Sequence, residues 1–210
     1  MDFLDEKIIE ARRKEAQREL DIREDGLIVK GEKIEFQDTP LFQEKMSILL
    51  PVSFVDMPQK IARLKYPSEQ RPQIIKTDLL GSTNFAFNLF DKAIKPVQMQ
   101  SAADGMKSIL KKVNPANIFY ESGTEPLGET MLSWFEFKGH GIDTQIYYIV
   151  FLTSIGGKLM HGIFNCAVAD MEAWKEAAFQ AGICVEAGPI PDAGCLVLPC
   201  QKAAQRPRSV

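Results

Sequence analysis

Residue types that carry out most enzyme chemistry are scarce in this chain. Its 210 residues include two histidines and four cysteines. The sequence contains no P-loop, no G-x-G-x-x-G after a predicted strand, no G-x-S-x-G and no H-E-x-x-H. Cys195 and Cys200 lack a second ligand pair at the spacing of a zinc site. We therefore predict no catalytic residue, no bound metal and no cofactor, and the balance of the sequence is against an enzyme.

The few reactive side chains stand in positions that do not favour catalysis. His161 and Cys166 lie five residues apart in one predicted strand. Their side chains should point to opposite faces and cannot form a nucleophile–base pair. His140 stands between two glycines, where we expect an exposed side chain. These positions favour a structural interpretation of both histidines.

Long apolar stretches are also missing. The longest, residues 146–152, is far short of the roughly 20 residues that span a bilayer. Residues 1–25 carry nine acidic and six basic side chains, so they cannot form the apolar core of a secretory signal. Four cysteines do not make a disulfide framework in a chain of this length. We predict a cytoplasmic protein without a membrane span.

Charge of one sign is not concentrated in the chain. The sequence has 25 Lys and Arg against 28 Asp and Glu, a formal net charge of −3. It lacks the basic footprint that attracts nucleic acid, and we predict no nucleic-acid partner.

Three parts follow one another along the chain. Residues 1–25 consist of good helix formers without proline or glycine, which predicts a charged N-terminal helix. Residues 27–187 are predicted as a single α+β domain, and residues 188–210 as a proline-containing C-terminal tail. The apolar residues of the predicted helix form no single stripe. The helix therefore either lies loosely on its own domain or pairs with another copy in a homodimer.

The first part of the predicted domain is rich in turn signals. Residues 27–30 and 33–37 flank Gly31-Glu32 and predict a hairpin. We expect Asp38-Thr39-Pro40 to break that pattern, and residues 46–51 to form a strand stopped by proline. Four prolines make residues 51–72 irregular, with room for a short strand at 61–64.

A strand and a helix follow. Residues 84–90 alternate between apolar and polar side chains, as a strand does. One helical face is predicted from the spacing of five apolar residues, Ala102, Met106, Ile109, Leu110 and Val113. Ser101 and Asp104 resemble a capping box, and Asn114-Pro115 should end the helix.

The second half predicts an antiparallel sheet. Residues 117–121, 130–138, 144–155 and 158–167 are rich in β-branched and aromatic side chains, with a loop predicted at 123–128. Gly156-Gly157 predicts a tight hairpin. Asp170 should cap a helix that Gly182 closes, and a last short strand is possible at 183–186.

The third of these strands predicts how the sheet is covered. Residues 146–152 are apolar at every position, so both faces of the strand need cover. The fold class predicted for the chain is therefore α+β, with an antiparallel sheet and helices packed on both faces.

The order of these elements, with Ile48-Leu49-Leu50-Pro51 before the proline-rich stretch, resembles the PsbP-like fold family. That fold occurs in a photosystem extrinsic subunit, in a Ran-release import factor and in bacterial DcrB-like accessory proteins. Its members are mostly binding or assembly factors without a shared active site. The resemblance implies an accessory role here and carries no functional residue across.

Residues 65–72 are the most unusual local stretch. Two prolines restrict the backbone on either side of a segment that holds Tyr66 and Arg71. Tyrosine and arginine are favoured at interface anchors, so Tyr66 and Arg71 are the candidate partner- or ligand-contacting residues. The alternative is a rigid structural loop in which Arg71 pairs with Glu69 or with backbone carbonyls.

Three functions remain open on the sequence. The leading hypothesis is a non-catalytic cytoplasmic module that binds another protein or itself. The second is a carrier of a small-molecule or lipid-like ligand, in a pocket lined by aromatic residues of the sheet such as Trp134 and Tyr148. The third is an enzyme whose site the sequence does not reveal.

Overall fold

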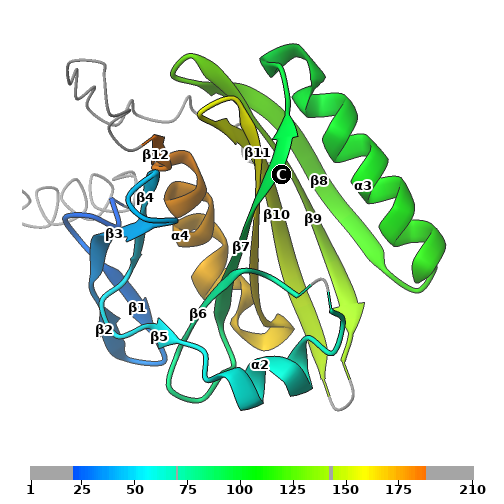
Figure 1. The fold of residues 1–210 in the computed structure, drawn as a ribbon. Coiled ribbons are helices and arrows are strands. Elements are labelled where there is room, and N and C mark those ends of the chain that lie inside the picture. The colour runs from blue at the N-terminus through cyan, green and yellow to red at the C-terminus, as the bar shows by residue number, and fades with distance from the viewer. Residues whose placement is uncertain (1–20, 70, 142–143, 188–210) are drawn as a thin grey trace, which may run out of the picture.

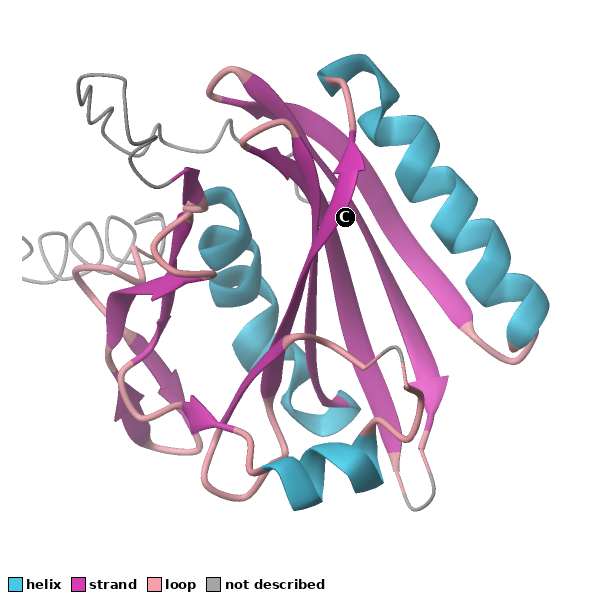
Figure 2. Ribbon diagram, in the orientation of Figure 1, coloured by secondary structure: helices cyan, strands magenta, loops and turns pink. Residues whose placement is uncertain are grey.

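A computed structural model of the chain describes residues 21–69, 71–141 and 144–187. It contains an antiparallel sheet of seven strands, two smaller sheets and helices packed against them (Figures 1 and 2). The predicted α+β class with an antiparallel sheet is confirmed. Of the predicted N-terminal helix, residues 1–20 lie outside the described residues, and residues 22–25 form turns, so the prediction of helix as far as residue 25 is wrong. The whole of the predicted tail also lies outside the described residues.

The seven-stranded sheet has the spatial order β5-β6-β7-β11-β10-β9-β8, and all neighbouring strands are antiparallel. The strands span Val55–Asp56 (β5), Ile74–Thr77 (β6), Asn84–Ala93 (β7), Ile118–Leu127 (β8), Thr130–His140 (β9), Gln145–Ile155 (β10) and Lys158–Ala167 (β11). The strands predicted at 84–90 and in the second half of the chain all belong to this sheet.

The turn between β8 and β9 is shorter than predicted. The predicted loop at residues 123–128 is wrong, because residues 123–127 continue β8 and the turn consists of Gly128 and Glu129. Gly123 is suited to this strand because the Trp134 ring lies over it. A Cβ at Gly123 would be 2.9 Å from Trp134 Cε2, so a larger residue does not fit there.

Two hairpins use corner residues with positive φ. Gly156 and Gly157, with φ of 55° and 76°, close the hairpin of β10 and β11 as predicted. A first hairpin pairs β1 (Leu27–Val29) with β2 (Glu32–Ile34). Its corner is Lys30-Gly31 instead of the predicted Gly31-Glu32, because Val29 pairs directly with Glu32.

A three-stranded sheet has the order β12-β4-β3, with β3 at Phe36–Leu41, β4 at Met46–Pro51 and β12 at Glu186–Ala187. The strand predicted at residues 46–51 is confirmed. The expected break at Asp38-Thr39-Pro40 is wrong, because all three residues lie within β3. β3 is an edge strand, where the missing N–H of Pro40 is tolerated.

Helix α2 spans Gln59–Lys65, in the region where the prolines predicted irregular structure and a short strand at 61–64. That prediction is wrong. Pro58 directly precedes the helix, where a fixed φ and a missing N–H suit its first turn. Pro67 follows the helix, and the residue before a proline disfavours helical backbone. The prolines therefore delimit this helix instead of preventing it.

Helix α3 spans Met99–Val113 and follows a short 3-10 helix, η1, at Pro96–Gln98. It ends at Asn114 as predicted, but its N-cap is Gln98, so the predicted Ser101 capping box is wrong. Its inward face consists of Met99, Ala102, Ala103, Met106 and Leu110. Ile109 and Val113, both predicted on that face, are exposed because the helix packs along a neighbouring stripe.

Helix α4 spans Met171–Ile183 and follows the 3-10 helix η2 at Val168–Asp170. The predicted side-chain cap of Asp170 is absent within the described residues. Its carboxylate instead accepts a hydrogen bond from Lys30 Nζ at 2.9 Å. Gly182 lies inside the helix and not after it, and the Phe151 ring packs directly against it. A Cβ there would lie 2.5 Å from Phe151 Cε1.

Two large core clusters pack on the seven-stranded sheet. The α4 cluster joins Trp174 and Phe179 of that helix to sheet residues that include Phe85, Trp134 and Phe164. The α3 cluster joins Met99 and Ala103 to Phe135 and Phe137. β10 supplies Ile149 and Phe151 to the α4 cluster and Val150 and Leu152 to the α3 cluster, because successive side chains of a strand point to opposite faces.

A third, smaller group is the α2 cluster, in which Ala62 packs with Met57, Ile75 and Ala86. α2 lies beside the end of the sheet where β6 turns into β7 (Figure 1). Within the described ranges, no helix is long and apolar enough to span a bilayer.

Candidate functional site

Tyr66, the first candidate contact residue, directly follows α2 and turns inward. Its ring packs against the α2 cluster, and its hydroxyl accepts a hydrogen bond from Asn165 Nδ2 at 3.3 Å. Burial raises the pKa of Tyr66, and the hydrogen bond from Asn165 opposes that change. Tyr66 is therefore a neutral anchor for the start of the 66–73 loop, which links α2 to β6.

Two buried asparagines extend this anchor across the sheet. Asn84 of β7 and Asn165 of β11 stand opposite each other in the strand register, and Asn84 Nδ2 donates to Asn165 Oδ1 at 2.8 Å. The hydrogen-bonded chain Tyr66–Asn165–Asn84 joins the loop to two central strands. Buried amides need such partners, so these hydrogen bonds fix the position of Tyr66 at the start of the loop.

Arg71, the second candidate, is half-buried near the other end of the loop. Two residues later, the Gln73 N–H donates to the Phe87 carbonyl at 3.1 Å and to Asn88 Oδ1 at 3.0 Å. The backbone beside Arg71 is thus held on β7. Arg71 Nε is buried and finds no hydrogen-bond partner in the described part of the chain, which is uncommon for a buried donor.

His161 projects from β11 on the same face as Asn165, because the two residues are four positions apart in one strand. Its ring stacks on Phe90, with 6.3 Å between centroids. Nε2 is buried without a hydrogen-bond partner among the described residues. Burial lowers the pKa of His161 to about 4, so the ring is neutral at physiological pH.

We expect His161→Gln to make the protein less sensitive to acid. An unfolded histidine takes up its proton near pH 6.5, whereas folded His161 does so near pH 4. Between these values the unfolded state is favoured by protonation, so the free energy of unfolding falls as the pH drops. Urea unfolding at about pH 7 and about pH 4.5 should show that the variant loses on the order of 2 kcal/mol less stability than the wild type.

The exposed His140 provides the matched control. His140→Gln removes a histidine from the end of β9 without touching a buried ring. This variant should keep the acid loss of the wild type. An unchanged acid loss in His161→Gln would contradict the assignment of His161 as a buried neutral side chain.

Cys166 lies away from His161, as the spacing predicts. It is fully buried in the α4 cluster, whereas His161 stacks on Phe90. Burial raises the pKa of the Cys166 thiol to about 12. A thiol in that state is a poor nucleophile. The described residues also contain no group of three or more His, Cys, Asp or Glu side chains that could hold a metal ion.

A buried carboxylate, which the sequence analysis did not single out, lies beside the α4 cluster. Glu136 of β9 is 1% exposed, accepts a hydrogen bond from the Tyr147 hydroxyl, and pairs with Lys175 Nζ of α4 at 3.0 Å. Burial and the neighbouring Glu136 raise the pKa of Tyr147 well above its usual range. The group links α4 to β9 and β10.

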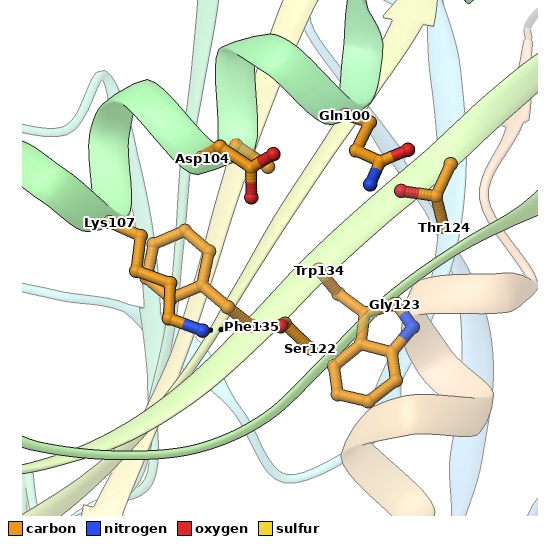
Figure 3. A pocket seen from close by; sticks show the side chains of 9 residues that line it. Gln100, Asp104, Lys107, Ser122, Gly123, Thr124, Trp134 and Phe135 are labelled. Atoms are coloured by element: carbon orange, nitrogen blue, oxygen red, sulfur yellow. Dashed lines mark hydrogen bonds between the residues drawn. The ribbon is translucent and has the colours of Figure 1, made fainter.

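A shallow pocket lies between α3 and β8 (Figure 3). Asp104 and Lys107 of α3 stand over Ser122 and Thr124 of β8, and Lys107 Nζ donates to Ser122 Oγ at 3.2 Å. Its volume is about 60 Å³, which is far below the roughly 300 Å³ of a small ligand pocket. A second pocket, near Ile22 and Lys33, has about 180 Å³.

The turn between β6 and β7 carries the most exposed apolar residues near the candidate loop. Leu79 is 83% exposed and Leu80 is 91% exposed. Sequence reasoning missed them, although two adjacent leucines before a glycine in a predicted gap between strands are a readable signal. We refer to residues 78–83 as the leucine turn.

Comparisons with known proteins bear on the fold. No protein-family model and no curated protein matches the sequence. Among solved structures, the chain is similar to cyanobacterial PsbP from Synechocystis, with a TM-score of 0.51 and 14% identity over 77% of this chain and 98% of that one. It is also similar to LpqN, involved in cell envelope biogenesis of Mycobacterium tuberculosis, with a TM-score of 0.46 and 11% identity over 77% and 95% of the two chains. The predicted PsbP-like fold is confirmed, and identities this low carry no function across.

Proposed function

We propose that this chain with a PsbP-like fold is a non-catalytic binding module of the cytoplasm, and that it contacts another protein through the 66–73 loop. The observation that carries the proposal is the buried Nε of Arg71, which has no acceptor among the described residues. A partner carboxylate or carbonyl would satisfy this donor if the Arg71 side chain turned outward on binding. Hydrogen bonds to charged groups are among the stronger ones in proteins.

The anchoring of the loop supports the same proposal. Tyr66 holds one end through Asn165, and Gln73 holds the other end through Phe87 and Asn88. A surface fixed in this way loses little conformational freedom when a partner binds, which favours affinity. Between the two anchors, Pro67, Ser68 and Glu69 are exposed.

The proposal assumes that helices cover both faces of the seven-stranded sheet. A partner would then contact the loops at the ends of the sheet instead of its faces. The separate α3 and α4 clusters support that arrangement. The aromatic side chains considered for a carrier pocket are largely packed: Trp134 contacts Phe179, and Tyr148 stacks on Phe137 at 4.6 Å between centroids. This packing and the small pockets give the carrier hypothesis less support.

A photo-crosslinking amino acid at position 69 tests the proposal. In native lysate, it should give one adduct of defined mass, either with another protein or with a second copy of the chain. The same amino acid at Glu129, in the exposed turn after β8, serves as the matched control and should give no such adduct. Arg71→Ala should weaken the crosslink about tenfold. Equal crosslinking from both positions, or none from position 69, would contradict the proposal.

Self-association through residues 1–25 is a second part of the proposal. Ile22 is buried in the α4 cluster, and its N–H donates to Gln180 Oε1 at 3.1 Å. A deletion should therefore stop at residue 20. We expect this truncation to convert a dimer into a monomer in analytical ultracentrifugation. An unchanged sedimentation coefficient after mass correction would argue against pairing through this segment.

A further inference from the structure

The leucine turn is an ordered protrusion. The Gly81 N–H donates to the Asp78 carbonyl at 3.0 Å, and the Asp78 N–H donates to the Thr83 carbonyl at 3.1 Å. The Asp78 carboxylate accepts further hydrogen bonds from the Ser82 N–H, at 2.6 Å, and from its hydroxyl. The turn thus holds Leu79 and Leu80 at its corner, where both side chains face solvent.

Helix α2 brings further exposed apolar residues to the same end of the sheet. Lys65 Nζ donates to the Gly81 carbonyl, which ties the end of α2 to the leucine turn. Ile61 and Leu64, one helical turn apart, are both exposed. We call Ile61, Leu64, Leu79 and Leu80 the α2 surface. Exposed apolar side chains scattered singly are ordinary, whereas a group of four at one end of a sheet is a candidate interaction surface.

The charges around the α2 surface are mostly positive. Residues 57–68 contain Lys60, Arg63 and Lys65 and no acidic residue. Three acidic residues are nearby. Asp56 pairs with Lys76 at 2.8 Å, Asp78 accepts hydrogen bonds from Ser82, and Glu69 lies in the following loop. The chain as a whole has a net charge of −3, so residues 57–68 are more cationic than the chain average.

We propose that the α2 surface docks on an anionic lipid membrane, with Leu79 and Leu80 entering the headgroup boundary and Lys60 and Arg63 contacting lipid phosphates. This goes beyond the protein-binding role proposed above. Leucines beside cationic residues are the composition of segments that lie in membrane interfaces. Lipid tails also accept a protruding pair of leucines without a matching pocket, and an anionic leaflet attracts this end while it repels the acidic remainder.

Sedimentation with vesicles tests the docking of the full chain. We expect binding to vesicles of equimolar phosphatidylcholine and phosphatidylglycerol, weak binding to phosphatidylcholine alone, and release by salt. Leu79→Ser with Leu80→Ser should reduce binding at least about tenfold. Lys60→Gln with Arg63→Gln should reduce binding by more than about tenfold, since each basic residue near an anionic surface contributes about fivefold.

A matched control uses exposed apolar residues elsewhere. Val97 and Val113 are 86% and 77% exposed at the two ends of the segment that contains α3, and Val97→Ser with Val113→Ser should bind vesicles as the wild type does. Equal binding to both vesicle types, no binding to the mixed vesicles, or full binding by the leucine variant would overturn the proposal. If the leucine variant instead loses a protein crosslink while the wild type ignores vesicles, the α2 surface binds a protein and the lipid assignment is wrong. Crosslinking from position 69 reports separately on the protein-binding role.

Discussion

Gly182→Ala should destabilise the protein by about 2–3 kcal/mol, although alanine forms helices better than glycine. The substitution gains up to about 1 kcal/mol of intrinsic helix propensity. The new methyl group would however lie 2.5 Å from Phe151 Cε1 and 2.8 Å from Phe151 Cδ1. Overpacking in a close-packed core typically costs about 1–3 kcal/mol, and a clash this short falls at the upper end. Urea unfolding measures the difference.

Gly105 in α3 is the matched control. It also lies inside a helix, but apart from its chain neighbours and the backbone of its own helix, nothing lies within 4 Å of the position its Cβ would take. Gly105→Ala should therefore stabilise the protein by roughly 0.5–1 kcal/mol. In the Gly182→Ala background, Phe151→Leu should cost less than it does in the wild type, because the two positions are in contact. Equal effects of alanine at Gly105 and Gly182 would contradict the packing of α4 against β10.

Lys175→Met should destabilise the protein by about 2 kcal/mol. It leaves the Glu136 carboxylate buried with the Tyr147 hydroxyl as its remaining hydrogen-bond donor among the described residues. Removing one partner of a fully buried ion pair costs about 3–5 kcal/mol. The Lys175 side chain is 37% exposed, so water can partly replace it and the expected loss is smaller.

Lys158 provides the comparison for this prediction. It pairs with Asp91 at 2.8 Å, but both side chains are well exposed, and Lys158→Met should change the free energy of unfolding by less than about 0.5 kcal/mol. Replacing both Glu136 and Lys175 by apolar residues of similar size should recover most of the loss, because no charge then remains buried. A Lys175→Met variant as stable as Lys158→Met would show that Glu136 does not depend on its lysine.

The sequence predicts best where two independent signals agree. Gly156-Gly157 between two β-rich runs identifies a hairpin because both corner residues need positive φ, and the structure has one there. The end of α3 at Asn114 follows from a proline that comes directly after it. In both cases the residue type restricts the backbone dihedral angles locally, so the local structure depends little on tertiary contacts.

The predictions failed where tertiary packing selects among local possibilities. Pro58 and Pro67 predict irregular structure, yet they stand just before and just after α2, whose Ala62 packs in the α2 cluster. Pro40 lies in a strand because no neighbour needs its N–H on the outer side of that edge. Which side of α3 turns inward depends on the strands beneath it. Met99 and Ala103 are buried there, whereas Ile109 and Val113 are exposed.

Residue type alone identifies Tyr66 as a candidate contact residue. Its hydroxyl instead accepts a hydrogen bond from Asn165 inside the fold. Side-chain direction after a seven-residue helix depends on the path of the loop, which composition does not specify. The buried neutral state of His161 likewise depends on Phe90 from another strand, and no local pattern reports such a neighbour.

The pairing of β12 with β4 has a consequence for synthesis. Glu186 and Ala187 stand opposite Ser47 and Met46, so strand partners some 140 positions apart must meet before the small sheet is complete. β4 is synthesised long before β12. The backbone groups on the edge of β4 that will pair with β12 therefore stay unpaired through most of translation. Such late, non-local closure slows folding and favours wrong associations in the interval, so β4 is a segment that a chaperone could protect.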